Sequence, residues 1–254
     1  MKVITITRKG LICILACFLI TAIICSITTS TASKIVAANN TKRDIPIYYV
    51  DTKDKVCSIS FDAAWGNEQT DILLDILDEY NIKTTFFLVG EWVDKYPESV
   101  RKIHERGHDI GNHSDTHAHL TQLSRSEQKE ELVSCNEKIK AITNKDVTLF
   151  RPPYGEYDNS VVGTTKECGM YCVQWNIDSL DWKDPTPQDM VTRIDNKLCE
   201  GSIILLHNGA KNTPQALPLI IESILNQGYK IVPISELLLE GEYTTDHEGK
   251  MICK

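Results

Sequence analysis

Short apolar runs and longer amphipathic stretches alternate along the chain from residue 55 onward. The short runs favour strands, and the longer stretches repeat apolar residues at the spacing of a helix face. We predict seven strands, at residues 56–61, 84–89, 108–111, 147–150, 171–177, 202–206 and 229–232. Strands that alternate with helices are typically parallel and joined by right-handed crossovers. The pattern therefore predicts an α/β fold, a distorted (β/α)-barrel of about seven parallel strands.

Helices are predicted between these strands, at residues 70–80, 92–106, 124–142, 158–167, 187–198 and 214–227, with a last turn at 235–239. Ser124 and Glu127 have the spacing of a capping box. Thr70 is expected to cap the first helix. The buried face of that helix is predicted to carry Ile72, Leu73, Ile76, Leu77 and Tyr80.

The amino-terminal segment does not fit the barrel pattern. Lys2, Arg8 and Lys9 precede an uncharged apolar run at residues 11–27, which predicts a signal or membrane-anchor segment over residues 1–30. The basic end stays inside, so the rest of the chain is expected outside the cytoplasm, either anchored or secreted after cleavage near Ala38. Residues 31–54 are predicted to be a linker, 55–240 the barrel and 241–254 a tail.

Charge and cysteine content narrow the function. A net charge of −8 without long like-charge blocks argues against binding nucleic acid or anionic lipid and favours a neutral or cationic substrate. Cysteines 13, 17 and 25 lie in the apolar segment. The others are Cys57, Cys135, Cys168, Cys172, Cys199 and Cys253, and we expect most of them to be buried thiols, although an exported chain can form disulfides.

Ionisable residues follow five of the predicted strands. They are Asp62, His113, Arg151, Asp178 and His207. In a parallel barrel the carboxyl ends of all strands open on one face, which carries the active site. Any one of them can be an ordinary solvated loop charge, but five together predict a catalytic pocket.

His113 and His117 are four residues apart, with only small polar residues between them. Two imidazoles at this spacing can present neutral nitrogens to one divalent metal. Isolated pairs of this kind are common without metal. The two histidines therefore indicate a candidate metal site, and the strength of this hypothesis depends on which charged groups lie around them.

At these positions the chain resembles the polysaccharide deacetylases, which share the NodB-homology domain. The resemblance covers roughly residues 55 to 235 in five ordered motifs: Ser60-Phe61-Asp62-Ala63-Ala64-Trp65-Gly66, His113-Ser114-Asp115-Thr116-His117, Arg151-Pro152-Pro153-Tyr154-Gly155, Asp178-Ser179-Leu180-Asp181-Trp182 and Leu205-Leu206-His207-Asn208. Each motif alone is a weak signal, and five in order are a strong one. The first motif looks most like the exported branch of spore-forming bacteria that acts on peptidoglycan.

The resemblance implies hydrolysis of N-acetyl groups on a cell-wall glycan by a monomer. Asp62 matches the catalytic base, Arg151 its partner and His207 the general acid. Asp181, or secondly Asp178, matches the carboxylate that charges His207. His113 and His117 match the metal ligands, and Tyr154 matches the backbone donor to the oxyanion. Trp182 and Trp65 either offer flat apolar faces to a sugar ring or pack in the core.

One residue departs from the family pattern. The family places a second aspartate after the base, where it completes an Asp-His-His set for zinc or a similar divalent metal, and here that position is Ala63. Loss of one ligand of three weakens metal binding. Asp62 or Glu68 is an alternative ligand.

Three other functions remain as alternatives. The barrel can be a glycan-binding module that lost catalysis with Ala63, or a membrane-tethered wall component. A zinc peptidase is disfavoured, because Ser114 stands where a zincin has its glutamate.

Overall fold

The computed structural model describes residue 21 and residues 43–254, and residues 44–254 form one compact unit. The predicted anchor segment, the cleavage position near Ala38, the first three cysteines and most of the predicted linker lie outside the described residues. Among the residues described, no helix is both long and apolar enough to cross a bilayer.

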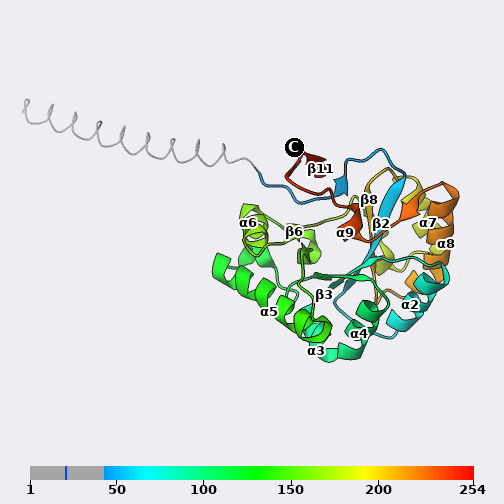
Figure 1. Cartoon of the computed structure of the whole chain (residues 1–254), viewed down its shortest axis with the longest axis horizontal. Coiled ribbons are helices and arrows are strands. Elements are labelled where there is room, and N and C mark those ends of the chain that lie inside the picture. The colour runs from blue at the N-terminus through cyan, green and yellow to red at the C-terminus, as the bar shows by residue number, and fades with distance from the viewer. Residues whose placement is uncertain (1–20, 22–42) are drawn as a thin grey trace, which may run out of the picture. The chain divides into compact units, whose positions relative to one another are not determined.

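The central strand is β2 (Val56–Ala63), which lies between β3 (Thr85–Leu88) and β8 (Ser202–His207) in a parallel sheet (Figure 1). The sheet continues from β3 through β4 (Asp109–Asn112) and β5 (Leu149–Phe150) to β6 (Tyr171–Cys172). On the other side, β7 (Ile177–Asp178) pairs with β8. The result is an α/β half-barrel of mostly parallel strands, which agrees with the predicted distorted barrel.

The barrel is open between β6 and β7. The single strand predicted at residues 171–177 is in fact these two short strands, and no ladder joins them within residues 43–254. The reason is a third segment. Ile47 N–H donates to Cys172 O, and Gln174 N–H donates to Ile47 O, so the chain between β6 and β7 pairs with Ile47 instead.

The seventh predicted strand is shorter than expected and covers only one end of the sheet. It is β9 (Lys230–Ile231), and it pairs with Val56 and Cys57 at the amino end of β2. Further along the same edge, from Ser60 onward, β2 pairs with β3.

Three more strands lie outside the region predicted to form the barrel. They are β1 (Tyr49–Val50), in the predicted linker, and β10 (Tyr243–Thr245) and β11 (Lys250–Cys253), in the predicted tail. β1 pairs with β11 and, through Tyr49, with Ser202 of β8. The β10–β11 hairpin thereby extends the sheet beyond β8.

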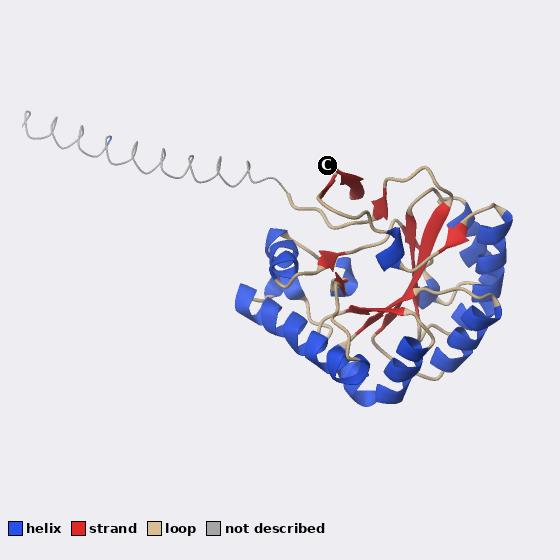
Figure 2. Cartoon of the chain, viewed as in Figure 1, coloured by secondary structure: helices blue, strands red, loops and turns tan. Residues whose placement is uncertain are grey.

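Helices cover the outside of the strands (Figure 2). They are α2 (Thr70–Glu79), α3 (Gly90–Lys95), α4 (Pro97–Glu105), α5 (Arg125–Thr143), α6 (Asn159–Glu167), α7 (Pro187–Asp195), α8 (Thr213–Asn226) and α9 (Ile234–Leu237). The helix predicted at residues 92–106 is two helices, α3 and α4. Proline has no N–H to donate and fits the first helical position, so Pro97 begins a new helix.

Helix ends follow the sequence only in part. The capping box is confirmed, with Ser124 Oγ accepting from Glu127 N–H and the Glu127 carboxylate accepting from Ser124 N–H. Thr70 was wrongly predicted as a cap: Gln69 is the N-cap. The prediction for Ile72 was also wrong. Its side chain is 50% exposed, because the buried face of α2 runs through Leu73, Leu74 and Leu77.

The six cysteines of the barrel are all free thiols. Cys57, Cys135 and Cys172 are buried, Cys168 and Cys199 are half-buried, and Cys253 is exposed. Burial raises the pKa of Cys57 and Cys172 to about 12, so these two thiols are protonated and pack as small apolar groups.

Candidate active site

The carboxyl ends of the strands surround a cavity of about 350 Å³. Its lining includes four of the five predicted strand-end residues, Asp62, His113, Asp178 and His207, while Arg151 lies behind Asp62. The sheet register brings the base and acid candidates together, because Asp62 of β2 is the Cα partner of His207 of β8. The five predicted residues therefore lie at or directly behind one cavity, as expected from their positions in the sequence.

Asp62 and Arg151 form a buried ion pair. Asp62 Oδ1 accepts from Arg151 Nη1 at 2.8 Å, and Arg151 Nη2 donates to Gln174 O. The guanidinium stacks on Phe87, 4.1 Å from the ring centroid, and Trp175 contacts it from further away. Burial is the largest single influence and by itself would raise the pKa of Asp62. The charge of Arg151, followed by His113, His207 and the hydrogen bond from Arg151, together outweigh burial and hold this pKa below its ordinary value. The carboxylate is therefore ionised at neutral pH.

His207 is held by Asp181. Asp181 Oδ1 lies 2.7 Å from His207 Nδ1, and Asp181 Oδ2 accepts from His207 N–H and from Thr213 Oγ1. Burial lowers the pKa of His207, but the hydrogen bond and charge of Asp181 outweigh burial and raise it above its ordinary value. Asp178 instead accepts from Leu180 N–H and lies at the cavity wall. Of the two predicted carboxylates, Asp181 is thus the one bonded to His207.

His113 and His117 lie side by side in the cavity, with ring centroids 5.0 Å apart. His113 Nδ1 bonds to Arg151 O at 2.7 Å, which leaves its Nε2 3.5 Å from Asp62 Oδ2. Burial lowers the pKa of both imidazoles, that of His117 to about 4. Both rings are therefore neutral at pH 7, the state in which imidazole binds metal.

A metal would find too few ligands here. Ala63 is fully buried and offers only a methyl group, and Asp62 is engaged by Arg151. Glu68 is exposed, and its carboxylate accepts from Asn67 N–H. Among the described residues, no three His, Cys, Asp or Glu side chains are placed to hold a metal together. The donor set therefore does not fit the three-ligand site that the resemblance implies.

Three exposed aromatic rings surround the cavity, and all three were predicted. Trp65 is 48% exposed, Tyr154 55% and Trp182 51%. The Trp65 ring stacks on His207 with centroids 5.2 Å apart. Gly209 permits this packing, since a Cβ there would lie 2.5 Å from Trp65 O. The Tyr154 ring lies against His117 and His119, and its backbone is left-handed at φ 61°.

Sequence reasoning missed several residues of the site. Trp175 lines the cavity and contacts Arg151, but it lies inside the strand predicted at residues 171–177 and is not ionisable, so the strand-end rule does not select it. Thr213 bonds to Asp181 from the start of α8. Nothing in the sequence around Thr213 indicates that contact.

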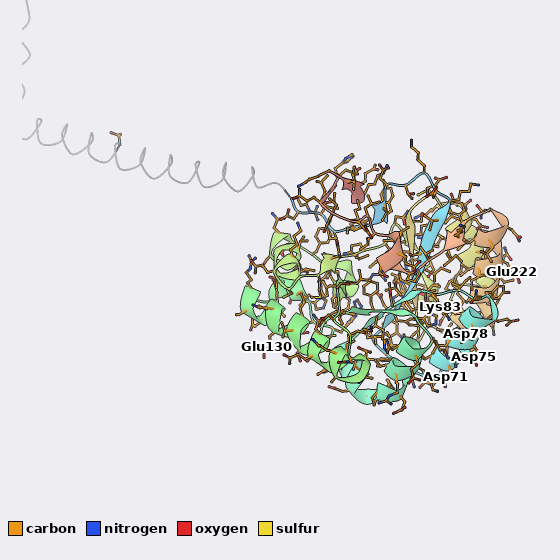
Figure 3. All side chains as sticks on the ribbon, in the orientation of Figure 1. Asp71, Asp75, Asp78, Lys83, Glu130 and Glu222 are labelled. Atoms are coloured by element: carbon orange, nitrogen blue, oxygen red, sulfur yellow. The ribbon has the colours of Figure 1, made fainter. Side chains whose placement is uncertain are left out.

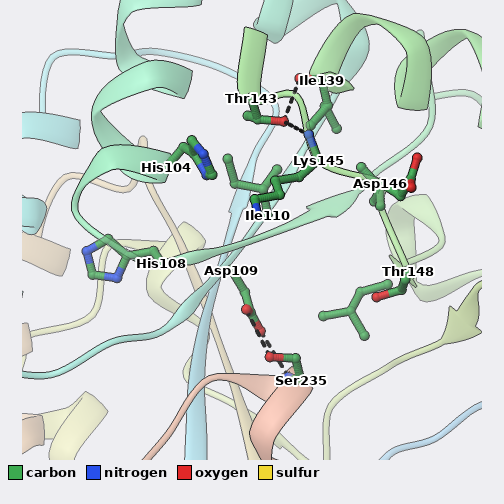
Figure 4. A pocket seen from close by; sticks show the side chains of 12 residues that line it. His104, His108, Asp109, Ile110, Ile139, Thr143, Lys145, Asp146, Thr148 and Ser235 are labelled. Atoms are coloured by element: carbon green, nitrogen blue, oxygen red, sulfur yellow. Dashed lines mark hydrogen bonds between the residues drawn. The ribbon is translucent and has the colours of Figure 1, made fainter. Parts of the chain in front are cut away.

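A second hollow, of about 200 Å³, lies near the amino ends of β4 and β5 (Figure 4). His104, His108 and Asp109 are among its lining residues. Asp109 accepts from Thr85 Oγ1 and from both the N–H and the hydroxyl of Ser235. This hollow contains none of the predicted catalytic residues.

Comparisons with known proteins agree with the resemblance seen in the sequence. Residues 49–173 match the polysaccharide deacetylase family. The chain is similar to the uncharacterized protein YlxY of Bacillus subtilis, 33% identical over 77% of this chain and 61% of YlxY, which is less than two thirds of that protein. It is also similar to the crystal structure of BA3943, a CE4 family pseudoenzyme from Bacillus anthracis, at 34% identity and a TM-score of 0.74, covering 82% of this chain and 70% of that one.

A further relative is peptidoglycan-N-acetylmuramic acid deacetylase PdaA of Bacillus subtilis. It is 33% identical over 199 residues, which cover 77% of this chain and 76% of PdaA. Identity at this level over three quarters of both proteins, together with the family match and the shared half-barrel, shows common ancestry. The chain belongs to the polysaccharide deacetylase family.

Proposed function

We propose that this protein removes N-acetyl groups from an N-acetylated cell-wall glycan, peptidoglycan in particular. The observation that carries the proposal is geometric: Asp62, paired with Arg151 at 2.8 Å, and His207, paired with Asp181 at 2.7 Å, line one cavity. Amide hydrolysis requires such a base and such an acid. The relatives support the substrate class, since PdaA is named for peptidoglycan.

In the proposed reaction Asp62 takes a proton from water, and the water oxygen attacks the acetamide carbonyl carbon. Arg151 keeps the Asp62 carboxylate ionised and oriented. The backbone N–H of Tyr154 stabilises the oxyanion. When the C–N bond breaks, His207 gives its Nε2 proton to the leaving amine, and the products are acetate and the free amino sugar.

The proposed steps do not involve a metal, because, among the described residues, the only side chains that the cavity offers as free metal ligands are His113 and His117. The exposed faces of Trp65 and Trp182 lie where a sugar ring would enter the cavity. We further propose that the protein acts as a monomer outside the cytoplasm, anchored by residues 1–30 or secreted after cleavage near Ala38. The apolar segment with its preceding basic residues supports this location.

A second candidate function is glycan binding without hydrolysis. Ala63 favours it, and so does the similarity to BA3943, whose structure is described as that of a pseudoenzyme. The survival of Asp62, Arg151, Asp181 and His207 as buried ion pairs favours the enzyme, because such groups are costly to bury without a role.

The test is acetate release from purified peptidoglycan by the full-length protein and by His207→Ala, with and without a chelator. We expect acetate from the wild type and a loss of about 10²- to 10⁴-fold in His207→Ala. The metal content of the protein is measured in parallel. Glycan retention without acetate at any metal concentration would select the binding module.

A further inference from the structure

The loop that carries His113 and His117 has a strained backbone. Ser114 and His117 have φ angles of 66° and 59°, in the left-handed region that residues with a Cβ rarely adopt. Such conformations persist only where surrounding contacts hold them. The question is therefore which contacts fix residues 113–117.

Glu131, on the helix α5, makes three hydrogen bonds to this loop. Its Oε2 accepts from Asp115 N–H and from Thr116 N–H, both at 2.9 Å, and its Oε1 accepts from Thr116 Oγ1 at 2.8 Å. The carboxylate thus accepts from two successive backbone amides between the two histidines. Bonds from amides to an ionised acceptor are stronger than bonds to a neutral one.

Two more residues of the same face of α5 hold Asp115. Ser134 Oγ donates to Asp115 Oδ2 at 3.0 Å, and Lys138 Nζ pairs with Asp115 Oδ1 at 2.7 Å. Residues 131, 134 and 138 follow the three- and four-residue spacing of one helix face. Gly90 also packs closely against the loop, because a Cβ there would overlap Asp115.

We infer that Glu131 is a positioning residue for the proposed reaction, because it fixes the loop that carries His117 and His113, and His113 Nε2 lies 3.5 Å from Oδ2 of the base Asp62. A displaced loop would therefore disturb the surroundings of the base. This inference rests on the proposed function for its effect on rate. Glu131 lies on α5 and is absent from the cavity lining, so its effect passes through the loop. Neither the resemblance nor the strand-end rule indicates it.

The experiment compares Glu131→Ala, Glu131→Gln and Glu130→Ala in the full-length protein. Glutamine keeps an acceptor oxygen for the two amides. Glu130 is the matched control, because its side chain is exposed on the same helix (Figure 3). No side-chain hydrogen bond or ion pair of Glu130 is found among residues 43–254. We expect kcat for acetate release to fall about 10- to 100-fold in Glu131→Ala with little change in KM, to recover largely in Glu131→Gln, and to be unchanged in Glu130→Ala.

Two readouts do not depend on activity. Amide hydrogen exchange at Asp115 and Thr116, and the ring proton signals of His113 and His117 in NMR spectra, are expected to change in Glu131→Ala alone. Wild-type kcat in Glu131→Ala despite faster exchange would overturn the inference. If the wild type releases no acetate, the proposed function fails, and the ring signals decide: a change supports positioning by Glu131, and no change overturns it.

A milder variant covers the case in which Glu131→Ala does not fold. Thr116→Val removes only the bond from an exposed hydroxyl to Glu131 Oε1. We expect a smaller change in the same ring signals. Wild-type signals and wild-type kcat in Thr116→Val, together with wild-type behaviour in Glu131→Gln, would overturn the inference.

Discussion

The cavity at the carboxyl ends of the strands and the hollow at their amino ends contain the same kinds of residue, histidine and aspartate, but they differ in what those residues have left to do. Asp62 gives one carboxylate oxygen to Arg151, and its other oxygen lies 3.5 Å from His113 Nε2. Asp109 has both oxygens bonded, to Thr85 and Ser235. The first carboxylate can accept a proton from a bound molecule, while the second ties α9 to the sheet.

The histidines differ in the same way. Asp181 raises the pKa of His207, so this ring carries a proton that it can transfer. Burial lowers the pKa of His108 to about 4, and His108 Nδ1 accepts from Thr84 N–H. A ring with so low a pKa is neutral near pH 7, so His108 does not offer the acid that His207 can. Spare bonding capacity in charged groups, rather than a concave shape, distinguishes the active-site candidate.

The largest expected difference between the two regions is in the rate of acetate release after the charge of Asp62 or of Asp109 is removed. Asp62→Asn should lower acetate release by about 10³-fold or more, because the base is lost. Asp109→Asn should leave the rate near wild type and lower the free energy of unfolding by about 1–2 kcal/mol, because hydrogen bonds weaken. Initial rates and urea unfolding measure the two quantities. Equal loss of activity in both variants would contradict the comparison.

A smaller effect, and a gain, is expected from Ala63→Asp. The substitution adds a carboxylate at the position where the family resemblance places the third ligand, so affinity for a divalent metal should rise about tenfold or more. Ala64→Asp, one residue further along, is the control. Calorimetric titration with zinc measures the change. If both variants bind zinc as weakly as the wild type does, then the alanine at position 63 does not explain the lack of a three-ligand metal site.

The pH dependence should report the Asp181–His207 pair. The acid must be protonated, so kcat/KM should fall as pH rises through the raised pKa of His207, and it should fall at low pH as Asp62 becomes protonated. Asp181→Asn removes the charge that raises the His207 pKa, so the alkaline limb should move to lower pH, with a loss of about tenfold at neutral pH. The acid limb should move little, because Arg151 is retained and its charge is the strongest of the influences that lower the pKa of Asp62.

The same pair should stabilise the fold in a defined pH range. Because the pKa of His207 is raised above its unfolded value of 6.5, the stabilisation is full below that pH and is lost as pH rises through the folded value. Unfolding of wild type and Asp181→Asn at several pH values checks the sign. A wild-type advantage that grows above the folded pKa would contradict it.

The smallest effect is expected at the amino-end hollow. His104 lines it and is only half-buried. His104→Ala should change the free energy of unfolding by less than about 0.5 kcal/mol and leave acetate release unchanged. A clear loss of activity would assign this hollow a role that its bonding pattern does not suggest.

The strand-end rule located most of the candidate site because an apolar run precedes each of these positions in the sequence, even where the strand itself is as short as β5 or β7. It could not choose between Asp178 and Asp181. That choice depends on Leu180, whose φ of 57° turns the chain so that Asp181 meets His207. The strands β1, β10 and β11 went unpredicted for another reason. They are two to four residues long. The partners of β1 are β8 and β11, far along the chain, and the local β10–β11 hairpin joins the sheet only through β1.

Helix boundaries were predictable to the extent that single residues set them. Ser124 and Glu127 satisfy each other's backbone amides, so the capping box alone fixed the start of α5. Pro97 also stands in the sequence, and its missing N–H was sufficient reason to divide the helix predicted at residues 92–106. Ile72 was not predictable in this way, since which stripe of α2 faces inward depends on the packing of the whole barrel.

The segment that fills the opening between β6 and β7 also links the start of the barrel to its catalytic charge. Ile47 O accepts from Gln174 N–H, and Gln174 O in turn accepts from the Arg151 guanidinium. Two hydrogen bonds therefore connect Ile47 to Arg151, the partner of Asp62. A recombinant fragment that begins at residue 55 would lack the first of these bonds. The residue at which such a fragment begins can therefore change the activity that is measured.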